Sequence, residues 1–226
     1  MEKRWVIKDA DEDKVNSLQQ DLKVHPVVCK LLVQRGIYTY EAARKFFRPV
    51  LTDLYDPFLM KDMQKAIDRI NTAIANNERI LIYGDYDVDG TTSVALAYSF
   101  FYSIYKNIDY YIPDRYLEGY GISTKGIDHA KQTECSLVIA LDCGIKAVDK
   151  IAYANTLGVD FIICDHHIPG DEVPAAIAVL DPHQKDCNYP YKELSGCGIG
   201  FKLIQAYAQH HQIAIEKIIP YLDLVV

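Results

Sequence analysis

No apolar run in this sequence is long enough to cross a membrane, and its first residues, MEKRWVIKDADEDK, lack the apolar core of a signal peptide. Low-complexity stretches are absent too, which argues against a disordered or fibrous chain. Of the 226 residues, 50% are hydrophobic and 24% are charged, as in packed proteins. We therefore expect a folded cytoplasmic protein with no membrane partner, large enough for one α/β domain with a smaller helical attachment.

Closely spaced cysteine pairs are also missing. The sequence contains no CxxC pair, and several cysteines lie inside apolar segments that are typical of strands. Disulfide frameworks and zinc sites both favour short, regular cysteine spacings. We expect reduced, mainly structural thiols at Cys29, Cys135, Cys143, Cys164, Cys187 and Cys197.

Positive charge is in deficit, because 24 lysines and arginines are outnumbered by 31 aspartates and glutamates, giving a formal net charge of −7. This balance argues against a protein that holds nucleic acid through overall basicity. It does not exclude a nuclease. Bound cations neutralise an acidic catalytic centre, and a few positive side chains near that centre can contact a nucleic-acid strand. Charge alone leaves the substrate open.

Residues 1–58 have the pattern of a small helical segment, with one short helix opened by Pro26 and a second capped by Thr39. From residue 60 to 75, apolar side chains recur with the i, i+3, i+4, i+7 spacing of an amphipathic helix. We predict that the main domain starts here and covers residues 59–226.

Five apolar runs in the main domain each end on an aspartate, at Asp85, Asp114, Asp142, Asp165 and Asp181. Helical patterns separate several of them, near residues 91–105, 125–132 and 146–157. Strands that alternate with helices predict an α/β fold, a mostly parallel sheet with helices on both faces. The carboxyl ends of parallel strands share one edge, where open α/β folds bind ligands. The sequence therefore predicts one acidic site at that edge.

The first motif, GDYDVDGTTS, follows the first of these strands. Asp85, Asp87 and Asp89 alternate, so an extended backbone would point all three toward one side. Two unit charges ~4 Å apart repel by about 4 kcal/mol at an effective dielectric constant of 20, and a divalent cation removes this penalty. The alternative is a solvated turn whose aspartates cap the next helix. An EF-hand is disfavoured, because no glutamate stands at the twelfth loop position.

Two further motifs end later strands. LDCG carries Asp142, which by itself is equally compatible with a helix cap and with a ligand. CDHHIPG carries Asp165, His166 and His167, and imidazole beside carboxylate suits a manganese or zinc type of ion better than calcium. A histidine pair is usually a surface feature, but its place opposite two acidic junctions favours a metal site.

Two segments are candidates for phosphate contacts. IPDRYLEGYG offers Arg115 beside aromatic residues, and arginine binds phosphate in a bidentate manner. SGCGIGFK offers backbone amides at a predicted helix start, together with Ser195 and Lys202. Glycine turns and surface arginines are common, so each segment alone is also compatible with a purely structural role.

Five motifs in this chain resemble, in their order, the motif series of the DHH phosphoesterase superfamily, over about residues 60–226. They are GDYDVDGTTS, IPDRYLEGYG, LDCG, CDHH and SGCGIGFK. They are most similar to its bacterial single-stranded-DNA-specific exonucleases, which IPDR and EGYG separate from shorter relatives. The resemblance implies a hydrolase that depends on two manganese or magnesium ions. It also implies removal of nucleotides from the 5′ end of single-stranded DNA in recombination and repair.

The resemblance further implies roles for individual residues. The metal ligands that it implies are Asp85 (as a ligand or close neighbour), Asp87, Asp89, Asp142 and His166. Asp165 would orient the histidines, His167 would face the scissile phosphate, and Arg115 would contact a substrate phosphate.

The superfamily continues past the LDLV stretch to a further aspartate and to additional domains that close over the strand. Because this chain stops on the apolar run YLDLVV, we expect a fragment with an incomplete metal site. We expect a monomer whose DNA groove lacks the wall that C-terminal domains would supply. Two alternatives stay open: a DHH phosphoesterase for short RNA, cyclic dinucleotides or pyrophosphate, and a non-catalytic DHH scaffold.

Overall fold

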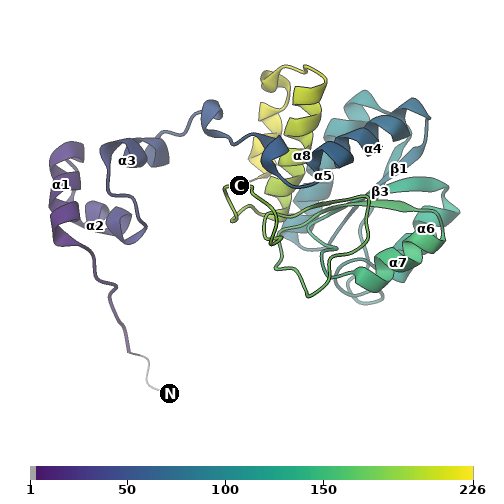
Figure 1. Ribbon diagram of the computed structural model, residues 1–226, viewed down its shortest axis with the longest axis horizontal. Helices are drawn as coiled ribbons and strands as arrows, with labels where there is room; N and C mark the ends of the chain where they lie inside the picture. Colours follow the sequence, from purple (N-terminus) through teal and green to yellow (C-terminus); the bar gives the residue numbers. More distant parts are fainter. Residues whose placement is uncertain (1–3, 226) are drawn as a thin grey trace. The chain divides into compact units, whose positions relative to one another are not determined.

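The computed structural model describes residues 4–225, and the chain divides between Tyr55 and Asp56 into two compact units. The first unit contains the helices α1 (Glu12–Leu22), α2 (Pro26–Gln34) and α3 (Tyr40–Phe47), followed by the 3-10 turn η1 (Leu51–Asp53) (Figure 1).

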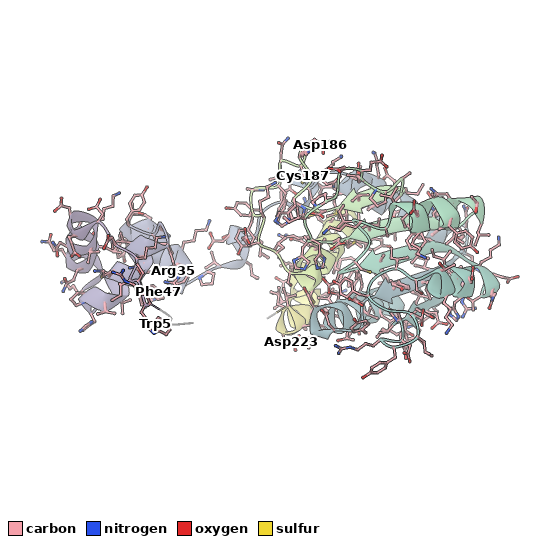
Figure 2. All side chains as sticks on the ribbon, turned by 90° about the horizontal axis from the view of Figure 1, so that it is seen from below. Trp5, Arg35, Phe47, Asp186, Cys187 and Asp223 are labelled. Atoms are coloured by element: carbon pink, nitrogen blue, oxygen red, sulfur yellow. The ribbon has the colours of Figure 1, made fainter. Side chains whose placement is uncertain are left out.

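Side-chain caps and a proline set the starts of these three helices. Asp11 caps α1 through two backbone amides, Pro26 occupies the first turn of α2, and Thr39 Oγ1 accepts a hydrogen bond from an amide of α3 at 3.2 Å. Their apolar faces form a small core of Val15, Leu18, Cys29, Leu32 and Ala43. Outside this core, Trp5 and Phe47 are exposed (Figure 2). The helices at Pro26 and Thr39 were predicted individually, whereas the mainly polar α1 was not.

The second unit is an α/β domain on a five-stranded sheet. Its strands are β1 (Arg79–Gly84), β2 (Ile108–Tyr111), β3 (Cys135–Leu141), β4 (Asp160–Cys164) and β5 (Ala178–Leu180). Its α-helices are α4 (Met63–Ala75), α5 (Val88–Ile104), α6 (Thr124–Gln132), α7 (Val148–Thr156) and α8 (Gly196–His210), and its 3-10 turns are η2 (Pro57–Leu59), η3 (Ile215–Lys217) and η4 (Ile219–Leu224). All neighbouring strands pair in parallel, in the order β2-β1-β3-β4-β5.

Helices cover both faces of the sheet, which confirms the predicted fold class (Figure 1). On one face, α6 and α7 pack over a core that includes Val138 and Phe161. On the other face, α4 and α5 pack against α8, and α8 contacts β3 and β4. Because both faces are covered, the central strands are buried throughout most of their length, and this explains their continuous apolar sequences.

Four of the five aspartates lie at the carboxyl edge of the sheet, as predicted. Asp85, Asp142, Asp165 and Asp181 directly follow the neighbouring strands β1, β3, β4 and β5, and all four are buried. Asp114 is the exception, because β2 ends at Tyr111 and the exposed Asp114 carboxylate accepts hydrogen bonds within its own turn. In the sheet, β2 lies on one side of β1 and β3 lies on the other. The direction in which strands are added therefore reverses at β1, and the crevice between β1 and β3 is the topological switch point.

Two helices begin at positions that differ from the sequence prediction. α5 begins at Val88 rather than Thr91, because the Asp87 carboxylate caps it by accepting a hydrogen bond from Gly90 N at 3.0 Å. α7 begins at Val148 rather than at residue 146, because a turn through residues 144–147 precedes it.

The six cysteines all lie within residues 4–225, where each is a buried free thiol. Within the same range, no helix is both long and apolar enough to span a membrane.

Candidate active site

The junction between β1 and α5 places the first acidic group at the switch point. Asp85 is fully buried; its Oδ1 accepts a hydrogen bond from Tyr86 N at 2.8 Å, and its Oδ2 has no partner within the described residues. Burial raises the pKa of this carboxyl, and the charge of Asp87 raises it further. The close packing depends on Gly90, because a Cβ there would lie 2.4 Å from the Asp85 carbonyl oxygen.

The three aspartates of this motif do not lie on an extended strand, so that expectation was wrong. Asp87 is the N-cap of α5, and Asp89 lies in the first helical turn. The Asp89 carboxylate accepts hydrogen bonds from Gly196 N and Cys197 N, both at 2.7 Å, at the start of α8. Asp87 therefore caps a helix, as the alternative interpretation of this motif proposed. Asp89 instead links α5 to the start of α8.

Asp142 is the buried carboxylate that follows β3. It is 2% exposed and has a positive φ of 60°, and its Oδ1 makes no hydrogen bond with the described residues but lies 3.2 Å from His166 Nε2. Burial raises the pKa of Asp142 to about 6, and the charges of Asp89 and Asp87 add to this effect, while His166 opposes it. Gly196 packs directly on this side chain, because a Cβ at Gly196 would lie 2.5 Å from Asp142 Oδ1.

The triplet Asp165, His166 and His167 follows β4. Asp165 Oδ1 accepts hydrogen bonds from the amides of both histidines and lies 2.7 Å from His167 Nδ1, while its Oδ2 accepts from Ile145 N at 2.9 Å. Its oxygens are thus engaged in holding the triplet. A proton on Nδ1 of His167, directed at this carboxylate, would leave a hydrogen-bond acceptor at Nε2. It lies 3.2 Å from the Tyr120 hydroxyl.

His166 turns toward the other carboxylates. Its Nε2 lies 3.2 Å from Asp142 Oδ1 and 3.7 Å from Asp89 Oδ2. The interaction with Asp142 raises the pKa of His166, against the lowering effect of burial. Asp142, His166 and His167 each offer a ligand atom within 4.8 Å of the other two, so the described residues include a group able to hold a metal ion.

The three predicted phosphate contacts have different outcomes. Arg115 is exposed, and its guanidinium lies over the Tyr86 ring at 5.3 Å, beside the acidic site. Ser195 caps α8 through Gly198 N at 3.1 Å, and the next two amides bind Asp89 rather than an external anion.

Lys202, the third candidate for a phosphate contact, is buried in α8. It is 4% exposed and donates to Gln205 Oε1 at 2.8 Å, and its Nζ lies 5.8 Å from the centre of the Tyr189 ring. Burial lowers the pKa of Lys202 to about 8, and the charge that opposes this effect belongs to Asp56, not to the site carboxylates.

Sequence reasoning placed Asp181 at the acidic edge but gave it no role in the site, and it gave none to the Tyr120 hydroxyl. Asp181 is fully buried after β5, and its Oδ2 lacks a partner among residues 4–225. Burial raises the pKa of Asp181 to about 6, and the charge of Asp165 raises it further. The sequence contained a sign of this position, because Asp181 ends one of the five apolar runs.

The Tyr120 hydroxyl also lies in the site. Burial, followed by the charges of Asp142 and other site carboxylates, raises the pKa of Tyr120, so its hydroxyl stays a hydrogen-bond donor.

This geometry agrees with a match of residues 79–226 to the family described as "DHH family, N-terminal domain". The chain belongs to the DHH family. The match covers the sheet from β1 to its last strand and α8, and therefore every motif that forms the acidic edge.

Relatives of this DHH chain include single-stranded-DNA-specific exonucleases named RecJ. The Bacillus subtilis (strain 168) protein is 47% identical over 203 residues, which cover 90% of this chain and 26% of the relative. The Escherichia coli (strain K12) protein is 31% identical over 236 residues, which cover 100% of this chain and 40% of the relative. The chain therefore spans well under half of the length of these relatives.

Solved RecJ structures share the DHH fold. The crystal structure of an exonuclease RecJ bound to manganese is 26% identical, with a TM-score of 0.67, and the match covers 74% of this chain and 42% of that one. The structure of RecJ from Thermus thermophilus in complex with Mn²⁺ is 22% identical, with a TM-score of 0.75, and the match covers 95% and 30% of the two chains. The second likeness is evidence of fold alone.

The DHH site combines two kinds of chemistry. Asp85 Oδ2 makes no hydrogen bond with the described residues, and Asp142 Oδ1 makes none but lies 3.2 Å from His166 Nε2; such carboxylate oxygens suit a hard divalent cation. His166 adds an imidazole nitrogen, which suits manganese better than calcium. Asp165, in contrast, orients His167 so that His167 Nε2 lies next to the Tyr120 hydroxyl. The aspartates and His166 can bind cations, and His167 with Tyr120 can exchange a hydrogen bond or a proton with an anionic substrate.

Proposed function

We propose that the whole protein is a metal-dependent phosphodiesterase that degrades single-stranded DNA from its 5′ end in DNA recombination and repair. The observation that carries this proposal is the buried Asp85 carboxylate, whose Oδ2 makes no hydrogen bond with the described residues, beside the buried Asp142 carboxylate and its partner His166 at the switch point. The naming of its relatives as single-stranded-DNA-specific exonucleases supports the choice of substrate. We place this activity in the cytoplasm, in a monomer whose further domains complete the DNA groove.

The cofactors that we propose are two manganese or magnesium ions, held by Asp85, Asp87, Asp89, Asp142 and His166. The residues fit such ions, because a buried carboxylate oxygen that makes no hydrogen bond is costly unless a cation binds it. Asp87 and Asp89 keep acceptor capacity on oxygens that also bind backbone amides. When bound, such ions lower the pKa of a water molecule and neutralise charge on phosphoryl oxygens.

The residues of this chain then have separate tasks in hydrolysis. The aspartates and His166 position the cations, and no side chain is needed as the nucleophile. Asp165 keeps the proton of His167 on Nδ1, so Nε2 faces the phosphate as an acceptor that the Tyr120 hydroxyl orients. Arg115 binds a phosphate of the strand, and we assign it to the 5′-terminal one.

Single-strand preference requires contacts that a duplex cannot make. Tyr116 is 92% exposed and Tyr120 is 56% exposed on the loop that carries Arg115. Exposed aromatic rings beside a cation stack on unpaired bases and contribute about 1–3 kcal/mol per base. The loop is therefore the part of this chain that we propose to contact unpaired bases.

The test is an assay of the whole protein with manganese on 5′-labelled single-stranded and duplex DNA. We expect release of 5′ mononucleotides from single strands, its loss in Asp142→Ala, and its retention in the exposed control Asp171→Ala. Cleavage of dinucleotides or pyrophosphate without cleavage of DNA would favour another DHH phosphoesterase. Metal binding without any hydrolysis would favour the scaffold.

A further inference from the structure

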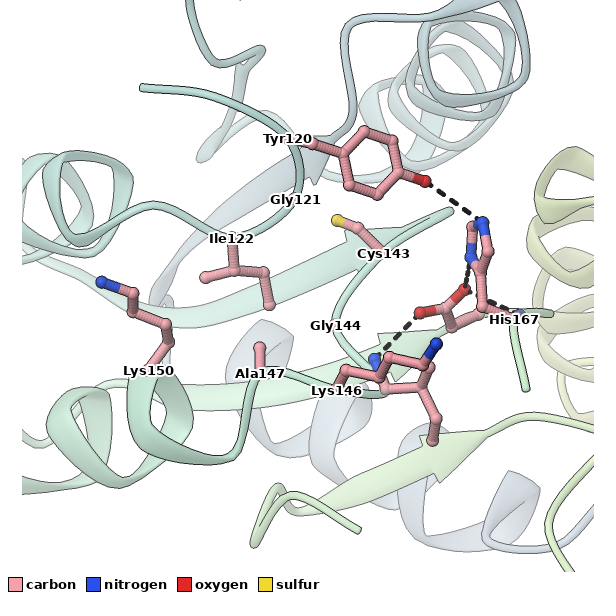
Figure 3. Close-up of a pocket in the computed structure, with 11 residues that line it drawn as sticks. Tyr120, Gly121, Ile122, Cys143, Gly144, Lys146, Ala147, Lys150 and His167 are labelled. Atoms are coloured by element: carbon pink, nitrogen blue, oxygen red, sulfur yellow. Dashed lines mark hydrogen bonds and ion pairs between the residues drawn. The ribbon is translucent and has the colours of Figure 1, made fainter. Parts of the chain in front are cut away.

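A pocket of about 290 Å³ lies beside His167, between the loop that carries Tyr120 and the start of α7 (Figure 3). Tyr120 and His167 lie at one side of this pocket, and Lys150 lies at the other side. The volume is at the lower end of the roughly 300–1,000 Å³ that is usual for small-molecule sites. The pocket can therefore hold one nucleoside-sized group and is too small for a base pair.

The inner wall of the pocket is apolar. Ile122, Cys143 and Ile145 are 7%, 2% and 1% exposed, and Ala147 continues this wall. Such walls favour the flat face of a base and a sugar over a small hydrated ion. Asp165 also lines the pocket, but its oxygens already accept hydrogen bonds from Ile145 N and from the DHH histidines.

Positive charge gathers at the rim of the pocket. Lys146 is exposed, and Lys150 Nζ donates to Thr124 Oγ1 at 2.6 Å, which holds this ammonium group in place. The first turn of α7 adjoins both lysines; it carries the exposed Asp149, and among the described residues no side chain caps it. Lysines beside an uncapped helix start form a site suited to phosphate.

A series of ring contacts leads from Arg115 to His167, and Arg115 lies outside the pocket that the two lysines line. Arg115 lies over Tyr86, the Tyr86 ring meets the Tyr120 ring edge-on at 6.1 Å, and the Tyr120 hydroxyl meets His167. Tyr120 and His167 also line the pocket, whereas Arg115 and Tyr86 do not. The arginine and the lysines therefore mark two phosphate positions, with His167 between them.

We propose that this pocket holds the second nucleotide of the substrate, on the 3′ side of the scissile bond. Its base and sugar lie against Ile122 and Ile145, and its 3′-phosphate binds Lys146 and Lys150. This inference rests on the proposed exonuclease function, in which the terminal phosphate lies at Arg115 and the scissile phosphate at His167. It assigns the strand a path across the domain, from the Tyr86 side to the start of α7.

The first test measures binding without metal, so it does not depend on catalysis. The metal-free chain is titrated with thymidine 3′-monophosphate, thymidine 5′-monophosphate, thymidine and inorganic phosphate, while the methyl signals of Ile122 and Ile145 are followed by NMR. We expect the 3′-monophosphate to bind most tightly and to shift both signals, because the phosphate of its 5′ isomer would meet the site carboxylates.

Matched substitutions locate the phosphate. The double replacement Lys146→Gln with Lys150→Gln is expected to weaken binding of the 3′-monophosphate about tenfold, or about 1.4 kcal/mol. Lys185→Gln, an exposed lysine outside the pocket, should leave it unchanged. Three results would each overturn the inference: tighter binding of the 5′ isomer, equal binding of inorganic phosphate, or no effect of the double replacement.

The second test uses the whole protein with manganese and compares a 5′-phosphorylated dinucleotide with the trinucleotide. The trinucleotide alone carries a phosphate after its second nucleotide. The double replacement should therefore lower kcat/KM for the trinucleotide and spare the dinucleotide. An equal loss on both substrates would refute the pocket assignment and leave the exonuclease proposal intact. Binding of the 3′-monophosphate by a protein that cleaves no DNA would refute the exonuclease instead.

Discussion

Replacing Asp142 with asparagine tests whether the acidic edge is held at a cost to stability when no metal is bound. The Asp142 side chain is 2% exposed, and its Oδ1 makes no hydrogen bond within residues 4–225 but lies 3.2 Å from His166 Nε2. Burial raises its pKa to about 6, the interaction with His166 opposes this rise, and the charges of Asp89 and Asp87 add to it. Asparagine keeps the shape of the side chain and removes its charge, so the two proteins differ mainly in electrostatics.

The sign of the effect follows from the two protonation states. The carboxyl has a pKa of 3.8 in the unfolded chain and about 6 in the folded protein, so the folded state binds this proton more tightly. The free energy of unfolding therefore falls between about pH 4 and pH 6 and stays lower above that range. Each tenfold change in proton affinity is worth about 1.4 kcal/mol, which gives a penalty of up to about 3 kcal/mol at neutral pH.

The assay is thermal and urea unfolding of wild type and Asp142→Asn in a chelating buffer, repeated with manganese, with the exposed Asp171→Asn as control. Without metal at neutral pH, Asp142→Asn should melt higher by roughly 2–10 °C, and near pH 4 the difference should vanish. Manganese should stabilise the wild type and not the variant. A metal-free variant that is less stable than wild type at neutral pH would refute the reasoning, because the pairing of Asp142 with His166 would then outweigh the cost of burying the carboxylate.

Gly196→Ala places a methyl group 2.5 Å from Asp142 Oδ1 and should lower the melting temperature by roughly 2–10 °C through overpacking, whereas Gly170→Ala, with its nearest contact at 3.9 Å, should not. Arg115→Ala removes an exposed side chain, so the melting temperature should stay unchanged while single-stranded DNA binding by the whole protein weakens and its logarithmic salt slope falls by about 0.7. Thr39→Ala removes the cap of α3 and should cost the N-terminal helical unit about 1 kcal/mol in urea unfolding; an unchanged midpoint would show that the cap is dispensable.

The sheet could be predicted because its strands are buried on both faces. A strand of this kind is a continuous apolar run, and the polar residue that follows it marks the carboxyl edge. This logic placed Asp85, Asp142, Asp165 and Asp181 correctly. It failed for Asp114, because β2 ends at Tyr111 and two further residues carry the chain away before the aspartate.

Contacts between distant segments could not be predicted. The alternating aspartates looked like one face of a strand, but the cap at Asp87 starts the helix early enough to include Asp89. The amides that bind Asp89 come from Gly196 and Cys197, more than a hundred residues later, so no local pattern indicates them. Lys202 looked like a phosphate contact, yet its packing in α8 buries it, and only the tertiary fold shows that.

The close packing that builds the site also creates its electrostatic strain. Glycines at 90 and 196 let the chain approach Asp85 and Asp142 more closely than any side chain would permit. Strand order then puts these carboxylates on one edge with Asp181, and each of the three has a buried oxygen that makes no hydrogen bond with the described residues, although that of Asp142 lies 3.2 Å from His166 Nε2. Such an edge is least stable when its groups are charged and no cation is bound. An ion that binds these oxygens would remove the cost of burying their charge, so metal binding should be coupled to the stability of this edge of the sheet.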